Sequence, residues 1–366
     1  MRVALVHYWL VGMRGGEKVL EALCELFPDA DIFTLVLDRS AISETIGRHR
    51  IETSFLQRIG GRRHYQKMLP LMPQALESFD LSAYDLVVSS EAGPAKGIIP
   101  RPDALHVCYC HSPMRYIWDL APEYQREAGW LAGTALRLAG PRLRQWDVTT
   151  AARVDHFIAN SAFVAQRIEK YYRRDATVIH PPVDLGRFAI GTPGEAFLCA
   201  GQITPYKKID IAVEAFTRLG LPLVVIGEGV SDRLRALAGP NVHFLGPVGD
   251  AEVADWMARC RALVYPGVED FGIVPLEAMA SGRPVIACGR GGALETVAPG
   301  VTGILFEGQT VEALVHAVQR FELIEARLDP RAIRAHAESF GRGRFLSELR
   351  GYFREALGER QLQAVA

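Results

Sequence analysis

The stretch that decides the fold of this chain reads Leu263-Val-Tyr-Pro-Gly-Val-Glu-Asp-Phe-Gly-Ile-Val-Pro-Leu-Glu-Ala-Met-Ala-Ser-Gly-Arg-Pro-Val-Ile-Ala287. Residues 262–265 are apolar and predict a short buried strand, which Pro266 ends. Pro275 favours the start of a helix, and the Ser-Gly-Arg-Pro run at 281–284 ends that helix before a second strand at 285–287. This strand–loop–helix–strand order is typical of a parallel α/β sheet.

Two carboxylates flank the loop of this unit. Glu269 follows the strand, and we expect Glu277 in the first turn of the helix, where the helix dipole favours a negative charge. Backbone N–H groups at a helix start bind anions or hydroxyls, and an ionised carboxylate can accept from both hydroxyls of a sugar or ribose. The loop residues between the carboxylates that offer such N–H groups are Phe271, Gly272, Ile273 and Val274. From spacing alone, two solvated surface carboxylates remain the alternative.

Length and composition narrow the class of protein. The chain has 366 residues, 49% of them hydrophobic and 23% charged, with a formal net charge of −1. This predicts two globular α/β domains and argues against a nucleic-acid-binding protein. The first residues run directly into a strand rather than a signal peptide, and no apolar run reaches the roughly 20 residues of a membrane span. The six cysteines lack zinc-site spacing, and we expect reduced core thiols in a cytoplasmic protein.

Ligand-binding residues are expected where the predicted strands of the first domain end. A strand at 3–7 is followed by Gly15 and Gly16 and then by an amphipathic helix. A glycine-rich turn at this place lets the backbone approach a phosphate closely. His111 comes directly after a later strand at 105–109 and so falls at the same edge of the sheet. A plain tight turn and a structural histidine are the alternatives.

The second domain is expected to open with a strand at 196–200 and a loop that carries Gln202, Lys207 and Lys208. A lysine just before a helix can neutralise a diphosphate, although a surface lysine pair is the alternative. The strand at 223–226 is followed by glycines, but Asp232 stands where a dinucleotide-binding fingerprint has its third glycine. This argues against an NAD site, and therefore against an oxidoreductase.

The motif Glu269-x7-Glu277, followed by Ser-Gly-Arg-Pro-Val-Ile-Ala and by Gly-Gly-x-x-Glu at 291–295, resembles the donor site of retaining glycosyltransferases of family 4. The run His-Ser-Pro-Met-Arg-Tyr-Ile-Trp-Asp at 111–119 resembles the mannosyltransferase branch of bacterial surface-polysaccharide and O-antigen biosynthesis. The resemblance extends along most of the chain.

The resemblance implies the GT-B fold, with two Rossmann-like domains facing across a cleft. These are an acceptor domain at 1–184 and a donor domain at 185–344, with a last helix at 345–366 packing back on the first domain. In the last stretch, 345–366, the residues Phe345, Leu349 and Phe353 recur every four residues, as on one face of a helix.

The resemblance also implies a role for each candidate site residue. Glu277 holds the ribose, while Glu269 and the amides of 271–274 hold the transferred sugar. The donor diphosphate lies against Lys207, Lys208 and the turn of Gly15 and Gly16, the base lies against the backbone of Val248, and His111 orients the sugar or acceptor. Gln202 departs from the family, which has an arginine there, so one positive charge on the diphosphate is missing. We expect no cofactor and no metal. The resemblance also implies that the leaving phosphate itself takes the acceptor proton, so that no dedicated protein base is needed.

The expected reaction moves a hexose, by resemblance mannose from GDP-mannose, to a glycan on a lipid carrier. The basic segment 48–67 suggests attachment to the inner face of a membrane, because apolar residues such as Phe55, Ile59 and Tyr65 alternate with its arginines. A solvated arm or a subunit contact is the alternative. A weaker basic cluster consists of Arg137, Arg142 and Arg144.

Two other functions remain open on the same fold. They are a nucleotide-sugar epimerase and a non-catalytic sugar-nucleotide-binding protein. Asp29-Ala30-Asp31 resembles the Asp-x-Asp metal motif of other glycosyltransferases, but it precedes a strand and so falls on the edge opposite the ligand site. We therefore expect a structural role for this pair.

Overall fold

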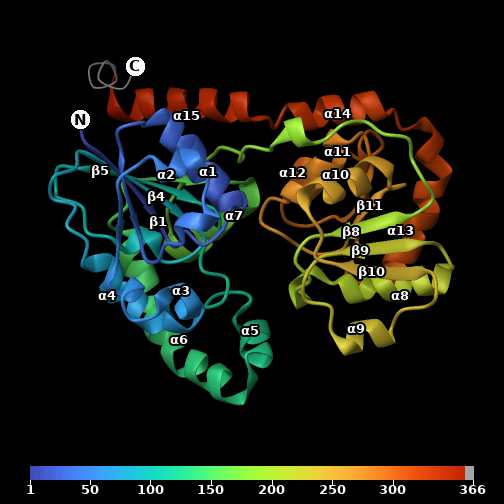
Figure 1. Ribbon diagram of the computed structural model, residues 1–366, viewed down its shortest axis with the longest axis horizontal. Helices are drawn as coiled ribbons and strands as arrows, with labels where there is room; N and C mark the ends of the chain where they lie inside the picture. The colour runs from blue at the N-terminus through green and yellow to red at the C-terminus, as the bar shows by residue number, and fades with distance from the viewer. Residues whose placement is uncertain (359–366) are drawn as a thin grey trace. The chain divides into compact units, whose positions relative to one another are not determined.

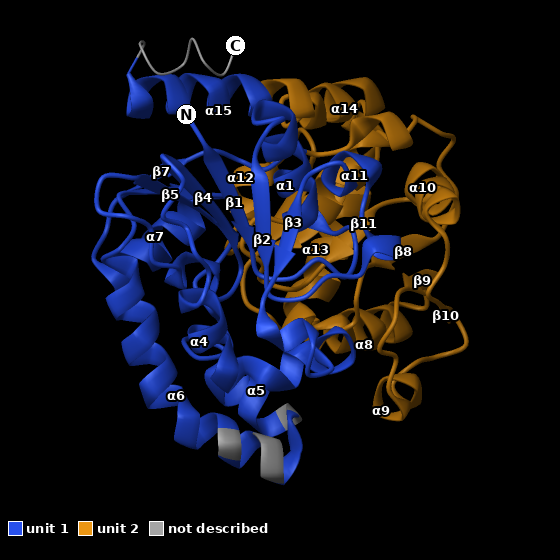
Figure 2. Cartoon of the chain, turned by 60° about the vertical axis from the view of Figure 1, so that its left-hand side comes forward, with its two compact units in different colours: residues 1–182, 345–366 blue, residues 183–344 orange. Residues whose placement is uncertain are grey.

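The computed structural model of the protein describes residues 1–358, except for the side chains of residues 127, 131, 132 and 135 (Figure 1). The chain divides into two compact units, coloured separately in Figure 2. Unit 1 consists of residues 1–182 and the chain from Phe345 onward, and unit 2 consists of residues 183–344. Each unit is built around its own parallel sheet.

Unit 1 contains a seven-stranded parallel sheet in the order β3-β2-β1-β4-β5-β6-β7. Its strands are β1 (Val3–His7), β2 (Asp31–Thr34), β3 (Ile51–Thr53), β4 (Leu86–Glu91), β5 (Leu105–Cys110), β6 (His156–Ala159) and β7 (Ala176–Val178). Every residue of β1 and β4 is buried, as expected for strands covered on both faces. The order of the strands reverses between β1 and β4, which creates a topological switch point there.

The helices of unit 1 cover the faces of this sheet. They are α1 (Gly15–Leu26), α2 (Glu44–Gly47), α3 (Gly61–His64), α4 (Met72–Glu77), α5 (Ala121–Glu127), α6 (Gly129–Ala151), α7 (Ala162–Tyr172) and α15 (Arg342–Leu357). On α15, Phe345 and Phe353 are buried in the core of unit 1, where their rings lie 5.8 Å from Tyr109 and 5.1 Å from Phe27. Both views show α5 and α6 extending beyond the sheet at the end opposite α15 (Figures 1 and 2).

Unit 2 contains a six-stranded parallel sheet in the order β10-β9-β8-β11-β12-β13. Its strands are β8 (Phe197–Ala200), β9 (Leu223–Ile226), β10 (Val242–Gly246), β11 (Leu263–Tyr265), β12 (Val285–Cys288) and β13 (Gly303–Phe306). Its helices are α8 (Ile209–Leu219), α9 (Asp232–Ala236), α10 (Asp250–Arg259), α11 (Ile273–Ala280), α12 (Ala293–Thr296), α13 (Val311–Ile324) and α14 (Pro330–Glu338). The strand order reverses between β8 and β11. The predicted pair of doubly wound parallel sheets is therefore confirmed.

The start of α11 corrects one prediction. The helix begins at Ile273, two residues before Pro275, so Glu277 is its fifth residue and not part of its first turn. Gly272 has φ = +92°, a left-handed conformation that turns the chain into the helix early. The ring of Pro275 is tolerated at the third position because the first four N–H groups of a helix have no intrahelical partner.

Two further sequence features have a direct structural counterpart. All six cysteines are buried free thiols, as expected of core residues. Within residues 1–358, the helices are all too short or too polar to cross a membrane.

Candidate active site

The candidate site residues of unit 2 gather at the switch point of its sheet. Lys207 ends a short 3-10 turn (Pro205–Lys207) after β8, and Glu269 lies in the loop after β11. The Nζ atom of Lys207 lies 3.0 Å from Oε1 of Glu269, and both side chains are mostly shielded, with 14% and 21% exposed. Ligands of doubly wound sheets bind beside the carboxyl ends of the strands at such a point. The two predicted charges therefore meet where a ligand is expected.

Glycines bring the surrounding loops into close contact. A Cβ atom on Gly267 would lie 2.7 Å from the Cα of Lys207, and one on Gly292 would lie 2.3 Å from the Cα of Phe271. The N–H of Gly292 also donates to the carbonyl of Glu269 at 2.9 Å. Side chains at these two positions would force the loops after β8, β11 and β12 apart. The Gly-Gly pair after β12 thus fixes the loop that carries Glu269.

Glu277 lies in the second turn of α11 and is partly buried. Burial raises the pKa of its carboxyl to about 7, an effect that the positive charge of Arg187 partly offsets. Asp250 raises this pKa further, whereas Lys207 lowers it. Glu277 thus lies within the electrostatic influence of Lys207, and a small change of environment near neutral pH alters its charge.

The N-terminus of α11 supplies backbone donors beside these side chains. Ile273 and Val274 are the first two residues of the helix, so their N–H groups have no partner within it. Phe271 is buried, and Gly272 makes the turn into the helix. The four residues 271–274 therefore form a buried loop and a helix start rather than a continuous loop.

The remaining candidates of unit 2 occupy the same edge of the sheet. Gln202 is exposed after β8, Lys208 has φ = +55° immediately before α8, and Val248 follows β10. The loops are joined by backbone hydrogen bonds, from Ile203 N–H to the carbonyl of Glu228 at 2.8 Å and from Gly227 N–H to that of Gly246 at 2.9 Å. Among the described residues, none of these three candidates forms a hydrogen bond or ion pair with Lys207, Glu269 or Glu277.

The switch point of unit 1 carries a second polar cluster. Ser90 of β4 lies between two imidazoles: its Oγ is 3.2 Å from Nδ1 of His7, at the end of β1, and 3.0 Å from Nε2 of His111, just after β5. On the other side of His7, the Nε2 atom lies 3.9 Å from Oε1 of Glu17 in α1. His7, Glu17 and Ser90 are buried. Of these residues, only His111 was predicted.

The glycine turn lies against this cluster. Gly15 and Gly16 are the first two residues of α1 rather than a separate turn. A Cβ atom on Gly16 would lie 2.9 Å from the hydroxyl of Tyr8 and 3.6 Å from Nε2 of His111. A side chain at residue 16 would therefore fit only if the hydroxyl of Tyr8 moved away.

The charge states of the cluster follow from burial. The pKa of His111 is lowered to about 3, mainly by burial, so His111 is neutral at physiological pH. Burial by itself would raise the pKa of Glu17, but its interactions with His7 and with the Arg14 N–H, at 3.0 Å from Oε2, bring it below the ordinary value. Glu17 is therefore ionised.

Two family models match successive parts of the chain. The model described as Glycosyltransferase Family 4 matches residues 13–187, and the model described as Glycosyl transferases group 1 matches residues 194–322. A D-inositol 3-phosphate glycosyltransferase of Streptomyces avermitilis is 30% identical over 337 residues, covering 72% of each chain. The enzyme of that name from Streptomyces griseus is 29% identical, covering 77% of this chain and 78% of its own.

This chain belongs to the family 4 glycosyltransferases. Solved structures support the GT-B fold of the glycosyltransferase. Anabaena Alr3699/HepE in complex with UDP-glucose has a TM-score of 0.69 at 18% identity, with 97% of this chain and 100% of that chain covered. The sucrose-phosphate synthase of Thermosynechococcus elongatus has a TM-score of 0.70 at 18% identity, with both chains covered completely.

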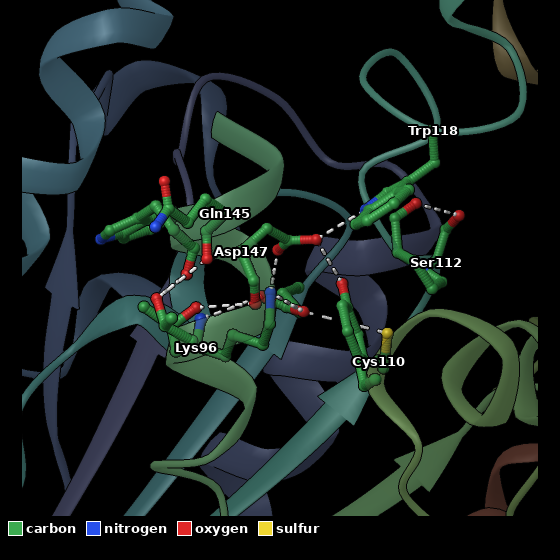
Figure 3. Close-up of polar contacts among 12 residues, drawn as sticks. Lys96, Cys110, Ser112, Trp118, Gln145 and Asp147 are labelled. Carbon is green, nitrogen blue, oxygen red and sulfur yellow. Dashed lines mark hydrogen bonds and ion pairs between the residues drawn. The ribbon is translucent and has the colours of Figure 1, made fainter. Parts of the chain in front are cut away.

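Sequence analysis of the glycosyltransferase missed one buried ionic cluster in unit 1. Lys96 is completely buried and forms ion pairs with Asp147 of α6 and, at 3.5 Å, with Glu91 of β4. Trp118 and Tyr172 donate to Oδ2 of Asp147 at 2.7 and 2.9 Å. Figure 3 shows Lys96 and Trp118 pointing toward Asp147. The sequence signal was weak: a glutamate and a lysine five residues apart after an apolar strand also fit a solvated loop.

The structure argues against a membrane-binding role for most of the apolar residues in and beside the basic segment 48–67. Leu56 is buried, and Phe55, Tyr65 and Met68 pack against the core of unit 1. Ile59 is the exception, with 54% of its surface exposed. Several of the cations also have partners, such as Arg62, which lies 3.5 Å from Asp38. The alternation of basic and apolar residues here mainly reflects core packing.

Asp31 occupies a structural position in the glycosyltransferase. It is the first residue of β2, accepts from the hydroxyl of Tyr84 at 2.6 Å and lies 3.6 Å from Arg2. Asp29 precedes the same strand. Both residues therefore lie at the amino end of β2, whereas Lys207, Glu269, Ser90 and His111 belong to carboxyl ends.

Proposed function

We propose that this glycosyltransferase binds a nucleoside diphosphate sugar at the switch point of unit 2 and transfers the hexose with retention of its anomeric configuration. The observation that carries the proposal is the Lys207–Glu269 ion pair between the ends of β8 and β11, with Glu277 on helix α11, which follows the loop that carries Glu269. A diphosphate fits a cation, and the hydroxyls of a sugar and a ribose fit two carboxylates.

The proposed chemistry is dominated by charge stabilisation. As the bond from sugar to phosphate breaks, the diphosphate gains negative charge and the sugar becomes oxocarbenium-like. Lys207 stabilises the leaving diphosphate, assisted within unit 2 by Lys208 and the amide of Gln202. Because the leaving phosphate takes the proton of the acceptor, the proposal needs no protein base. Because lysine charges neutralise the leaving diphosphate, the proposal also needs no metal. Full activity after dialysis against a chelator supports this point, and loss that a divalent ion restores contradicts it.

The remaining parts of the donor are the ribose, the transferred sugar and the base, and each has its own proposed contacts. Glu277 holds the ribose hydroxyls, and Glu269 with the N–H groups of Ile273 and Val274 holds the transferred sugar. The backbone of Val248 contacts the base. By resemblance we propose GDP-mannose as the donor, although a structural neighbour named above was solved with UDP-glucose. Incubating the enzyme with GDP-mannose and UDP-glucose separately, and following nucleoside diphosphate release, decides between the two donors.

The acceptor that we propose is a lipid-linked glycan at a cytoplasmic membrane surface, in polysaccharide biosynthesis. The exposed cations Arg58, Arg63 and Lys67 support this proposal. A second exposed face lies on α6, where Trp130 is 82% and Leu138 is 74% exposed near Arg137 and Arg142. The two surfaces are neighbours, because Leu69 and Leu143 pack in one apolar cluster. Cations and a tryptophan together suit the boundary of an anionic membrane.

A vesicle assay tests the membrane part. Changing Arg58, Arg62 and Arg63 to glutamate reduces binding to vesicles containing anionic lipid if the proposal holds, and leaves binding to neutral vesicles unchanged. Equal binding of the variant and the wild type to anionic vesicles contradicts the proposal.

Two alternative functions make different products. An epimerase converts the nucleotide sugar without any acceptor, so a new nucleotide sugar in an acceptor-free reaction favours it. A sugar-nucleotide-binding protein binds the donor but releases no nucleoside diphosphate with any acceptor. Gln202, in place of the family arginine, is the residue that favours this second alternative.

A further inference from the structure

We propose that Ser90, hydrogen-bonded to both His7 and His111, sets the tautomer of His111 in the direction that the carboxylate of Glu17 imposes on His7, leaving Nδ1 of His111 as a bare acceptor. Glu17, His7 and Ser90 are then positioning residues for His111, to which the family resemblance assigns the function of orienting the sugar or acceptor. The proposal rests on the proposed function only for the role of His111. The chain of contacts among Glu17, His7, Ser90 and His111 lies entirely within unit 1.

The geometry places one hydroxyl between two imidazoles. Ser90 Oγ lies 3.2 Å from His7 Nδ1 and 3.0 Å from His111 Nε2. Ser90 and His7 have no exposed surface, so bulk water does not compete for these contacts. A serine hydroxyl has a single hydrogen, so it donates to one imidazole and accepts from the other.

Glu17 determines the direction of the chain. Its Oε2 accepts the N–H of Arg14 at 3.0 Å, which holds the carboxylate in place, while its Oε1 lies 3.9 Å from His7 Nε2. An ionised carboxylate at this place favours a hydrogen on His7 Nε2, because the lone pair of a bare nitrogen would face a negative charge. The proposal includes a neutral His7, whose Nδ1 is then an acceptor and takes the hydrogen of Ser90.

The direction passes through Ser90 to His111. With its hydrogen directed at His7, the Ser90 oxygen accepts from Nε2–H of His111. A neutral imidazole carries one hydrogen, so the Nδ1 of His111 has a free lone pair and accepts hydrogen bonds but does not donate them. His111 therefore selects a ligand group that donates, such as a sugar hydroxyl, and disfavours a phosphate oxygen.

Nitrogen NMR of the full-length enzyme without ligand tests the chain directly. A long-range proton–nitrogen spectrum of ¹⁵N-histidine-labelled enzyme at pH 7.5 separates protonated from bare ring nitrogens, and His111→Asn assigns the signals of His111. We expect Nε2 protonated and Nδ1 bare. A protonated Nδ1, which results if His7 carries both hydrogens and the chain runs the other way, overturns the proposal.

Two serines of β4 provide a matched pair of variants. Ser90→Ala removes the middle of the chain, so we expect the His111 signals to shift toward a mixture of tautomers. Ser89→Ala removes the hydroxyl that lies 2.9 Å from Nε2 of His106, a different histidine, and leaves the His111 signals unchanged. Unchanged His111 signals in Ser90→Ala overturn the proposal.

The role of Glu17 has its own test. A measurement of transfer activity then separates the proposal on the His111 tautomer from the proposed function. Glu17→Gln removes the charge that orients His7, so the preference for a bare Nδ1 on His111 weakens. An unchanged tautomer in a folded Glu17→Gln variant contradicts the role of Glu17. If the NMR results are as expected but His111→Asn transfers sugar at the wild-type rate, the chain stands and the proposed role of His111 in transfer fails.

Discussion

The ammonium group of Lys207 lies 3.0 Å from the carboxylate of Glu269, and the two residues follow the adjacent strands β8 and β11. Each neutralises the other before a donor binds. In the complex that we propose, a diphosphate that takes up Lys207 releases Glu269 to bind the hydroxyls of the transferred sugar. This exchange links the binding of the two halves of the donor.

The first prediction concerns the cation of this pair. Lys207→Ala removes the main positive charge proposed for the leaving diphosphate, so we expect kcat to fall by about 10²–10³-fold, as for loss of one electrostatic stabiliser. Steady-state release of nucleoside diphosphate measures the effect. The control is Arg218→Ala, which removes a cation paired with Glu214 and Glu312 elsewhere in unit 2. A wild-type rate in Lys207→Ala excludes the lysine from the mechanism.

The second prediction concerns the pH dependence of donor binding. Burial raises the pKa of Glu277 to about 7, so its carboxylate is mostly protonated at pH 6 and mostly ionised at pH 8. Since the ionised form accepts from both ribose hydroxyls, affinity for the matching nucleoside diphosphate rises with pH, by up to roughly tenfold over this interval. Isothermal titration calorimetry at the two pH values measures it.

Glu277→Gln supplies the control for this pH dependence. The amide does not titrate, so the variant retains only the part of the pH dependence that arises from the nucleotide phosphate and from other groups. The rise in affinity from pH 6 to pH 8 is then smaller than in the wild type. Equal pH dependence in the two proteins contradicts the ribose role of Glu277.

The third prediction concerns the narrow space that Gly16 leaves at the start of α1. In Gly16→Ala the new methyl group lies 2.9 Å from the hydroxyl of Tyr8 and 3.6 Å from His111, so it crowds the switch point of unit 1. We expect transfer activity to fall at least about tenfold, which corresponds to about 1.4 kcal/mol in the activation free energy. Gly12→Ala is the matched control, because its methyl group has no neighbour within 4 Å. Equal activity of the two variants would show that this space is not used.

The fourth prediction concerns stability. Lys96→Met leaves Asp147 buried without its cation, and breaking a buried ion pair in this way costs about 3–5 kcal/mol in the free energy of unfolding. Urea denaturation measures this cost. Arg48→Met is the control, because Arg48 pairs with Glu44 at the surface, where both side chains are more than 70% exposed. A Lys96→Met variant as stable as the wild type would show that Asp147 is satisfied by Trp118 and Tyr172 alone.

The sequence predicts the strands of the two sheets better than it predicts helix starts or buried polar contacts. Apolar runs such as Val3–His7 and Leu263–Tyr265 are strands because parallel sheets bury both faces, a property visible residue by residue. The start of α11 was predicted wrongly because the helix preference of Pro275 was weighed without the left-handed turn at Gly272. Local sequence does not show which position in a first turn a proline takes.

Contacts between residues far apart in the sequence limit how much of the site could be predicted. His111 and Lys207 follow strands and Glu277 lies on the helix after β11, so their edge of the sheet is readable from the sequence. His7 and Ser90 are 83 residues apart, and Lys96 and Asp147 are 51 apart. Such contacts depend on strand order and on packing in three dimensions. Both buried polar networks of unit 1 were therefore found only in the structure.

The central claim is that the switch point of unit 2 binds a nucleoside diphosphate sugar, and ligand-induced thermal stabilisation tests it most directly. GDP, UDP and ADP are each added to the wild type and to Glu277→Ala, and Tm is recorded. One base should raise the Tm of the wild type by mass action, and Glu277→Ala should bind it more weakly by about 1.5–3 kcal/mol. No shift with any nucleoside diphosphate, or equal shifts in both proteins, would contradict the claim.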